Sequence, residues 1–199
     1  PSAIGTSGND DIYSWDQTVN PYGRDKIEEY KINTLVPRKY GAILSWLAAD
    51  GKDEEQTDGI AASEAIKKLD DFVKRDTPFF LAVGFFRPHT PFVAPKKYFD
   101  LYDREKIKIP EISSDYLTTL PEPAVKSIRA KKNQLNLEKE LAQEIKEAYY
   151  ATISFVDAQV GRILDQLEAY GLDKNTVVVF MSDHGYHMGE HGHWQKQTL

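Results

Sequence analysis

The sequence predicts an α/β fold, in which helices alternate with strands that pair side by side. Two continuous apolar runs, at residues 79–86 and 176–181, are typical of strands that are buried on both faces. A long helical pattern lies between them, and strand, crossover helix and strand in this order favour a mostly parallel central sheet flanked by helices.

A first helix is predicted over about residues 59–75. A side-chain oxygen of Thr57 or Asp58 can cap its N-terminus, and apolar residues from Ile60 to Val73 keep a helical period. The sequence Asp-Thr-Pro at 76–78 ends the helix, because a proline disfavours helical backbone in the residue before it.

The longest helical pattern places apolar residues every three or four positions from Leu137 to Leu167, so that they form one stripe. Gly171 follows at the position where helices commonly end. Residues 1–56 are expected to be a loop-rich segment that packs onto this scaffold. Residues 87–136 are also loop-rich, and the basic stretch 126–132 is interpreted as a solvated face.

The composition limits the class of protein. Of 199 residues, 41% are hydrophobic and 28% charged, as in a globular domain or part of a larger one. The net charge of −6 argues against general electrostatic binding to nucleic acid. The absence of cysteine excludes disulfides, a thiol nucleophile and a thiolate metal site, and no apolar run reaches the ~20 residues of a membrane span.

All five histidines lie in two short segments, and each segment follows one of the two apolar runs. His89 lies in the first, and the other four lie between His184 and His193. Ligands of open α/β sheets bind at the carboxyl ends of strands, so the two segments are expected to share one site.

Four residues in these segments are candidates for chemistry. Asp183 and His184 can supply two ligands to one cation, and a carboxylate suits Ca²⁺ or Mg²⁺. His89, beside a proline, is placed to bind an anion or protonate a leaving group, and the Lys196 ammonium can pair with an anionic ester.

Simpler interpretations stay open for each candidate. Asp183 and His184 can form a hydrogen bond at a turn, His89 can bond to a loop carbonyl, and Lys196 can be an ordinary surface residue. A second metal hypothesis assigns a zinc site to three further histidines, which are His187, His191 and His193.

Several stretches resemble the type I sulfatase family of the alkaline phosphatase superfamily, in particular its iduronate-2-sulfatase-like members. The resemblance covers residues 57–199 well and residues 1–56 loosely. It rests on TDGIAASEAIKKL from Thr57, PFFLAVGFFRPHTPFVAPKKYFDLY from Pro78, YYATISFVDAQVGRILDQLEAYGL from Tyr149, and TVVVFMSDHGYHMGEHGHWQK from Thr176.

The resemblance implies an alkaline phosphatase-like sandwich and a role for each matched residue. Asp183 and His184 match the pair that binds a divalent cation, usually Ca²⁺ with Mg²⁺ as the alternative. His89 matches the histidine that contacts the sulfate ester or its leaving oxygen, and Lys196 matches a lysine that contacts sulfate. The family nucleophile is a hydrated formylglycine aldehyde.

The sequence departs from the family pattern in two respects. The motif that yields formylglycine, Cys or Ser followed by x-Pro-x-Arg, is absent, and the early aspartates of the family metal site are not recognisable. The chain begins with Pro1 and stops soon after Lys196. We therefore expect a middle segment of a larger enzyme, with residues 57–199 as a C-terminally incomplete part of its catalytic domain and the formylglycine upstream.

The resemblance thus implies a segment of an enzyme that hydrolyses sulfate esters of a carbohydrate and is exported to the periplasm, cell exterior or lysosome. This segment is expected to be inactive without the remainder of the enzyme. Two alternatives stay open: a phosphoester or phosphonate hydrolase of the same superfamily, and a non-catalytic fragment.

Overall fold

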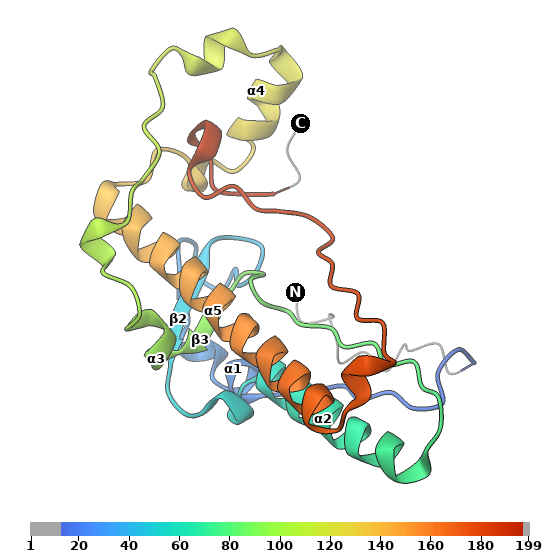
Figure 1. Cartoon of the computed structure of the whole chain (residues 1–199). Helices are drawn as coiled ribbons and strands as arrows, with labels where there is room; N and C mark the ends of the chain where they lie inside the picture. The colour runs from blue at the N-terminus through green and yellow to red at the C-terminus, as the bar shows by residue number, and fades with distance from the viewer. Residues whose placement is uncertain (1–12, 197–199) are drawn as a thin grey trace.

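The computed structural model describes residues 13–196 and has an α/β architecture (Figure 1). A small sheet lies against the first half of one long helix, and a second helix packs along the other half. The α-helices are α1 (Arg24–Ile27), α2 (Thr57–Arg75), α3 (Lys96–Phe99), α4 (Glu122–Arg129) and α5 (Lys139–Ala169), and the strands are β1 (Asn33–Thr34), β2 (Ser45–Ala49) and β3 (Phe92–Pro95).

Short 3₁₀ helices punctuate the connections between these elements. They are η1 (Glu29–Lys31), η2 (Asp53–Glu55), η3 (Arg104–Lys106), η4 (Tyr116–Thr119), η5 (Lys132–Gln134), η6 (Leu172–Lys174) and η7 (Glu190–Gly192).

The sheet has the order β1-β2-β3 and is mixed. β2 pairs antiparallel with β1 and parallel with β3, with Trp46 opposite Phe92. The central strand therefore comes from the region where the sequence predicts a loop-rich segment. β2 and β3 are only five and four residues long, and such short runs give a weak periodic signal.

The predicted long helix is confirmed as α5, and its apolar stripe builds the core. Phe155 is 1% exposed, and Ile145 is fully buried among residues of β2 and β3. Three alanines on the same stripe, Ala142, Ala148 and Ala151, let the helix approach the sheet closely. Gly171 adopts φ +67° just after the helix, as its position predicts.

The predicted first helix is confirmed as α2, but its N-terminus is held differently from the prediction. Thr57 and Asp58 both lie inside the helix. The Thr57 N–H donates to Oδ1 of Asp25 at 2.8 Å, so a carboxylate from α1 takes the role of the cap. Asp58 is thereby free to bind other backbone groups. Asp76 ends the helix in the left-handed conformation.

The two apolar runs are extended but do not form strands in the described part of the chain, so the prediction of buried strands is wrong here. Phe80 is 81% exposed, and Val177 and Met181 are 88% and 82% exposed. The sheet forms from other segments, β1 to β3, and neither run pairs with it. A strand is buried on both faces only where neighbours supply its hydrogen bonds and cover it.

No helix within residues 13–196 has the length and apolarity that crossing a membrane requires.

One buried amide joins the sheet to the C-terminal part of the chain. Gln134 is fully buried, and its Oε1 accepts a hydrogen bond from the Leu44 N–H at 2.7 Å. Its Nε2 donates to the carbonyl of Trp194 at 2.6 Å. Three segments far apart in sequence therefore meet at one side chain.

We expect Gln134→Ala to lower the free energy of unfolding by about 2–4 kcal/mol, because it leaves a buried N–H and a buried carbonyl without partners. Urea denaturation measures the change. Asn133→Ala, at the exposed neighbouring residue, is the control and is expected to change stability by less than about 0.5 kcal/mol. Equal effects of the two substitutions would show that the hydrogen bonds of Gln134 do not stabilise the fold.

Candidate active site

A tight hairpin connects the segment that holds Asp183 and His184 with Lys196. This C-terminal hairpin, residues 186–195, is closed by hydrogen bonds from His187 N to Gln195 O and from Gly189 N to His193 O, both 3.1 Å. Gly189 has φ +104°, and a Cβ there would lie 3.0 Å from the Pro110 ring. A side chain at this turn would therefore be strained by the backbone and crowded by the rings of Pro110 and Trp194.

The C-terminal hairpin is fixed to the body of the protein along both arms. Met188 and Trp194 belong to the main core, and Tyr186 packs edge-on against Phe92 of β3. Nε2 of the buried Gln195 donates to the carbonyls of Ser127 at 3.2 Å and Ile128 at 3.4 Å. The residues on either side of the hairpin therefore have a defined place.

His184 and Lys196 meet at the open end of the hairpin, as the sequence predicts. Lys196 Nζ lies 3.2 Å from Nε2 of His184. The other ring nitrogen, Nδ1, lies 2.8 Å from the Gly185 carbonyl and must donate to it. The imidazole is therefore in the Nδ1–H tautomer, and its Nε2 lone pair accepts from the lysine.

Asp183 presents a carboxylate beside this imidazole. Its Oδ1 accepts the His184 N–H at 2.9 Å, while Oδ2 lies 3.4 Å from His184 Nε2. The Asp183 side chain is 86% exposed. A hard oxygen donor and an unprotonated imidazole nitrogen thus lie on the same exposed side. This donor set fits two of the several positions that a divalent cation requires.

His89 lies on the loop between residue 86 and β3 and is half-buried. Its Nδ1 lies 2.5 Å from the Thr90 carbonyl, and the Thr90 hydroxyl donates to the Gly41 carbonyl at 2.7 Å. The predicted carbonyl contact of the simpler interpretation is therefore present. It also fixes the tautomer, so that Nε2 is the ring nitrogen left for a ligand.

Electrostatics place His89 with the other candidates. Burial lowers the pKa of His89 below its usual value, and the bond to the Thr90 carbonyl opposes this shift. The positive charge of Lys196, with smaller effects of Arg87 and His184, lowers the pKa further. Such an effect requires proximity. Lys196 thus meets His184 directly, and the charges of these two residues act on His89.

Lys131 is a residue of this region that sequence reasoning missed. It lies in the basic stretch interpreted as a solvated face, and Lys126 in that stretch does form an exposed pair with Glu122. Lys131 is instead partly buried, and burial followed by the charge of Lys196 lowers the pKa of Lys131. No sequence signal identifies Lys131, because the position of its side chain depends on the turn at η5.

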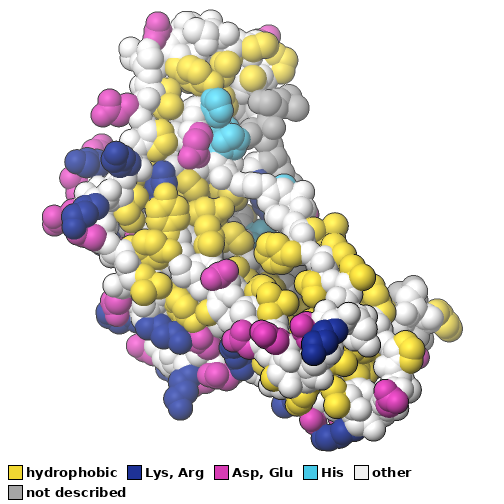
Figure 2. Space-filling view, viewed as in Figure 1, with side chains coloured by type: hydrophobic (Ala, Val, Ile, Leu, Met, Phe, Trp, Pro, Cys, Tyr) yellow, Lys and Arg dark blue, Asp and Glu magenta, His cyan; other side chains and the backbone are white. Residues whose placement is uncertain are grey.

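The remaining histidines form a cluster on the C-terminal hairpin. The ring centroids of His187 and His193 are 4.4 Å apart, those of His187 and His191 are 5.4 Å apart, and the Tyr116 hydroxyl bonds to His191 Nδ1. Figure 2 shows histidine side chains next to one another on this face, with an acidic side chain beside them. Between Tyr13 and Lys196, however, no three histidine, aspartate or glutamate side chains are arranged to hold a metal ion. The zinc hypothesis therefore has no support here.

Comparison with known proteins identifies related sequences. Residues 3–199 match the family model described as Sulfatase. The chain is 38% identical to a sulfatase of Formosa agariphila over 81% of its length, 28% identical to iduronate 2-sulfatase of Mus musculus over 97%, and 39% identical to an arylsulfatase of Clostridium perfringens over 63%. It spans 32%, 38% and 26% of these relatives, respectively.

The histidine cluster predicts acid sensitivity. Burial, with the charges of His187 and His191, lowers the pKa of His193 to about 4, while Glu190 opposes the shift. The unfolded chain has the ordinary value near 6.5 and binds the proton first as pH falls. The contribution of His193 to stability is therefore fully present above about pH 6.5 and is lost as the pH falls toward about 4.

We expect His193→Gln to reduce the difference between the unfolding free energies at pH 7 and pH 4.5, as measured by urea denaturation. Glutamine occupies a similar space and does not titrate. Lys126→Gln, on the exposed side of α4, should leave the pH difference as in the wild type. An undiminished difference in His193→Gln would show that other groups cause the acid sensitivity.

Proposed function

The chain belongs to the type I sulfatase family of the alkaline phosphatase superfamily, and on that premise we propose that the whole protein hydrolyses sulfate esters of a carbohydrate. The observation that carries the proposal is the meeting of Lys196 with His184 at 3.2 Å, with His89 in electrostatic range of both. These residues match the family positions that contact sulfate, the cation and the leaving oxygen.

A sulfate monoester makes two demands on such a site. Its oxygens carry negative charge, and the departing sugar oxygen needs a proton. Lys196 is suited to the first demand, because its ammonium is held at the site by the C-terminal hairpin. His89 is suited to the second, because its Nδ1 is occupied by Thr90 and Nε2 is left to carry the proton.

The lowered pKa of His89 bears on this role. The protonated imidazole is a stronger acid than that of an ordinary histidine, and a lower pH is needed to form it in the absence of a ligand. A sulfate anion beside it favours the protonated form, because opposite charges stabilise each other. This combination fits a general acid that is charged when substrate is bound.

Asp183 and His184 would hold a divalent cation, with Ca²⁺ favoured by the carboxylate and Mg²⁺ as the alternative. When bound, the cation supplies positive charge next to the sulfate oxygens. The Nε2 lone pair of His184, which Lys196 meets in this structure, would be the one that holds the cation, and the Lys196 ammonium would serve to bind the anion. Further ligands belong to the remainder of the protein.

The nucleophile is assigned by family likeness to a formylglycine in the remainder of the polypeptide, since residues 1–199 contain no cysteine and no Ser-x-Pro-x-Arg sequence. This chain's own contribution is to bind, orient and protonate. The likeness to iduronate 2-sulfatases supports a sulfated sugar of the glycosaminoglycan type as substrate and an exported enzyme.

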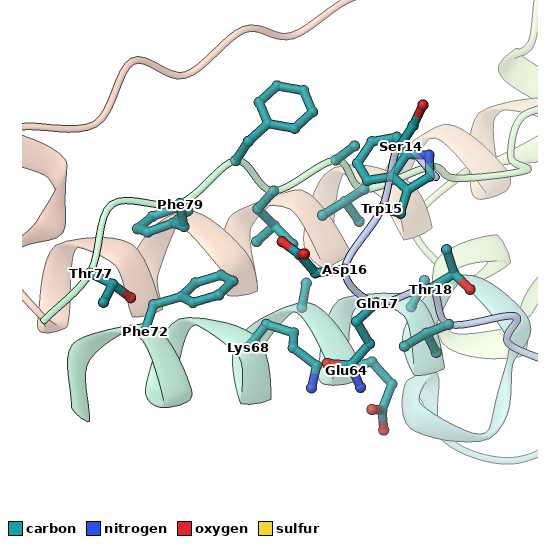
Figure 3. A pocket seen from close by; sticks show the side chains of 18 of the residues that line it. Ser14, Trp15, Asp16, Gln17, Thr18, Glu64, Lys68, Phe72, Thr77 and Phe79 are labelled. Carbon is teal, nitrogen blue, oxygen red and sulfur yellow. The ribbon is translucent and has the colours of Figure 1, made fainter. Parts of the chain in front are cut away.

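The remainder of the enzyme is also proposed to complete a mostly parallel sheet. The runs at 79–86 and 176–181 are apolar and extended, and Figure 2 shows apolar side chains over this face. A cavity of about 700 Å³ lies between residues 14–21, α2 and residues 77–84 (Figure 3). Additional strands beside these runs would fill such spaces and supply hydrogen bonds.

Hydrogen exchange tests this assembly. In the whole protein, the amides of residues 79–86 and 176–181 are expected to exchange at least 100-fold more slowly than in chain 1–199, on the order of the protection that sheet hydrogen bonds provide. The amides of α5 serve as the internal control, because they are hydrogen-bonded in both. Equal exchange rates in the two proteins would contradict the proposal.

The activity itself is tested with the whole, matured protein on matched nitrophenyl sulfate and nitrophenyl phosphate. We expect sulfate release that is lost with a chelator and restored by Ca²⁺ or Mg²⁺. Faster turnover of the phosphate ester would favour the phosphoester hydrolase alternative. Turnover of neither ester by protein with confirmed formylglycine would favour a non-catalytic role.

Lys196→Met should lower kcat/KM for the sulfate ester by about 100-fold or more, because it removes a charge that stabilises the sulfate oxygens. Lys126→Met, at an exposed lysine paired with Glu122, is the matched control and should retain wild-type kinetics. Steady-state kinetics with both variants provide the comparison, and similar values for the two would remove Lys196 from the site.

A further inference from the structure

The segment that carries His89 begins at a buried positive charge. The Arg87 side chain is 4% exposed, and its Nη2 donates to Oδ2 of Asp25 at 2.6 Å. The Asp25 side chain is itself 3% exposed. A buried charge of this kind is tolerated only with a partner, so Arg87 and Asp25 depend on each other.

The carboxylates around this guanidinium also hold the backbone. The other oxygen of Asp25 accepts both the N–H and the hydroxyl of Thr57, at 2.8 and 2.6 Å. Asp58 accepts the backbone N–H groups of Phe86 and Arg87, each at 2.9 Å. The start of the His89 loop is thereby fixed to the N-terminus of α2.

The rest of the Arg87 guanidinium reaches across the loop. Its Nε donates to the Val93 carbonyl at 2.8 Å, in β3, and its Nη1 lies 3.5 Å from the His89 carbonyl. One planar group therefore joins the first residue of the loop, the backbone of His89 and the strand that follows. A lysine has a single ammonium nitrogen, so it cannot make the contacts that the three nitrogens of the guanidinium make.

We infer that Arg87 is a positioning residue that holds the His89 imidazole in place for proton transfer to the leaving oxygen. This inference rests on the proposed function of His89. The loop is clamped at residues 87 and 93 by one side chain, and the Thr90 carbonyl orients the ring within that clamp. Asp25 and Asp58 support Arg87 by charge and by backbone hydrogen bonds.

The informative variant is Arg87→Lys in the whole enzyme. It keeps a positive charge beside Asp25, so the buried carboxylates of Asp25 and Asp58 are not left without a cation and the variant is expected to fold. It removes the bond from Nε to Val93. Arg162→Lys is the matched control, because Arg162 also bridges elements by its guanidinium, to Ser63 at 2.9 Å and Gln159 at 2.7 Å, between α2 and α5.

Leaving-group dependence separates positioning from a general structural effect. A sugar sulfate releases a basic alkoxide and needs the proton, whereas nitrophenyl sulfate releases a stable phenolate and does not. We expect Arg87→Lys to lower kcat for the sugar sulfate by about 10-fold to 100-fold, as small displacements of reacting groups do. For nitrophenyl sulfate the loss of kcat should stay within about threefold, because a displaced general acid slows only the substrate whose leaving group needs a proton.

Arg162→Lys should leave both rates near wild type. Equal losses of Arg87→Lys on the two substrates, or no loss on either, would overturn the inference. His89→Gln run in parallel tests the premise: if it shows no leaving-group dependence, the proposed role of His89 fails.

A second readout does not depend on activity. Histidine-selective NMR of the whole protein follows the ring of His89. In Arg87→Lys, release of the loop should expose the ring and raise the pKa of His89 toward its ordinary value, whereas Arg162→Lys should not change it. An unchanged His89 titration and tautomer in Arg87→Lys would show that Arg87 does not position the ring, whatever becomes of the catalytic role.

Discussion

The position of the His89 loop, one half of the candidate site, depends on one buried charge. The Arg87 side chain is only 4% exposed, so its charge needs Asp25 beside it, and Asp25 in turn holds the first residue of α2. Through this pair, α1, α2 and the His89 loop form one unit. A loop with two prolines at its centre thereby gains a defined place without a regular element of its own.

The second half of the site depends on packing rather than on charge. Trp194 and Met188 anchor the C-terminal hairpin in the core that α5 forms with β2 and β3, and Gln134 ties the hairpin to the start of β2. Because both ends of the hairpin are fixed, Lys196 returns to His184. Two independent supports, one ionic and one apolar, therefore converge on the same few side chains.

The described residues supply part of the catalytic apparatus that the proposed function requires. Asp183 and His184 offer two donors, and the exposed apolar runs before the two candidate segments lack strand neighbours in the described part of the chain. A type I sulfatase segment that spans about a third of its relatives is expected to share its metal site and its sheet with other segments. The proposals on cation, nucleophile and sheet follow from this share of the relatives' length and from the unpaired apolar runs of the described residues.

The sequence alone determined the two long helices, and it predicted four residues of the candidate site, His89, Asp183, His184 and Lys196. The apolar patterns of α2 and α5 repeat over many helical turns. The histidines stand out because all of them lie in two short segments that follow apolar runs. Only the tertiary structure decided that Asp25 caps α2, that Ser45–Ala49 forms the central strand, and that Lys131 lies near Lys196. The reason is physical: periodicity records which side of a local element is buried, whereas a cap, a strand pairing or a buried ion pair depends on residues distant in the chain.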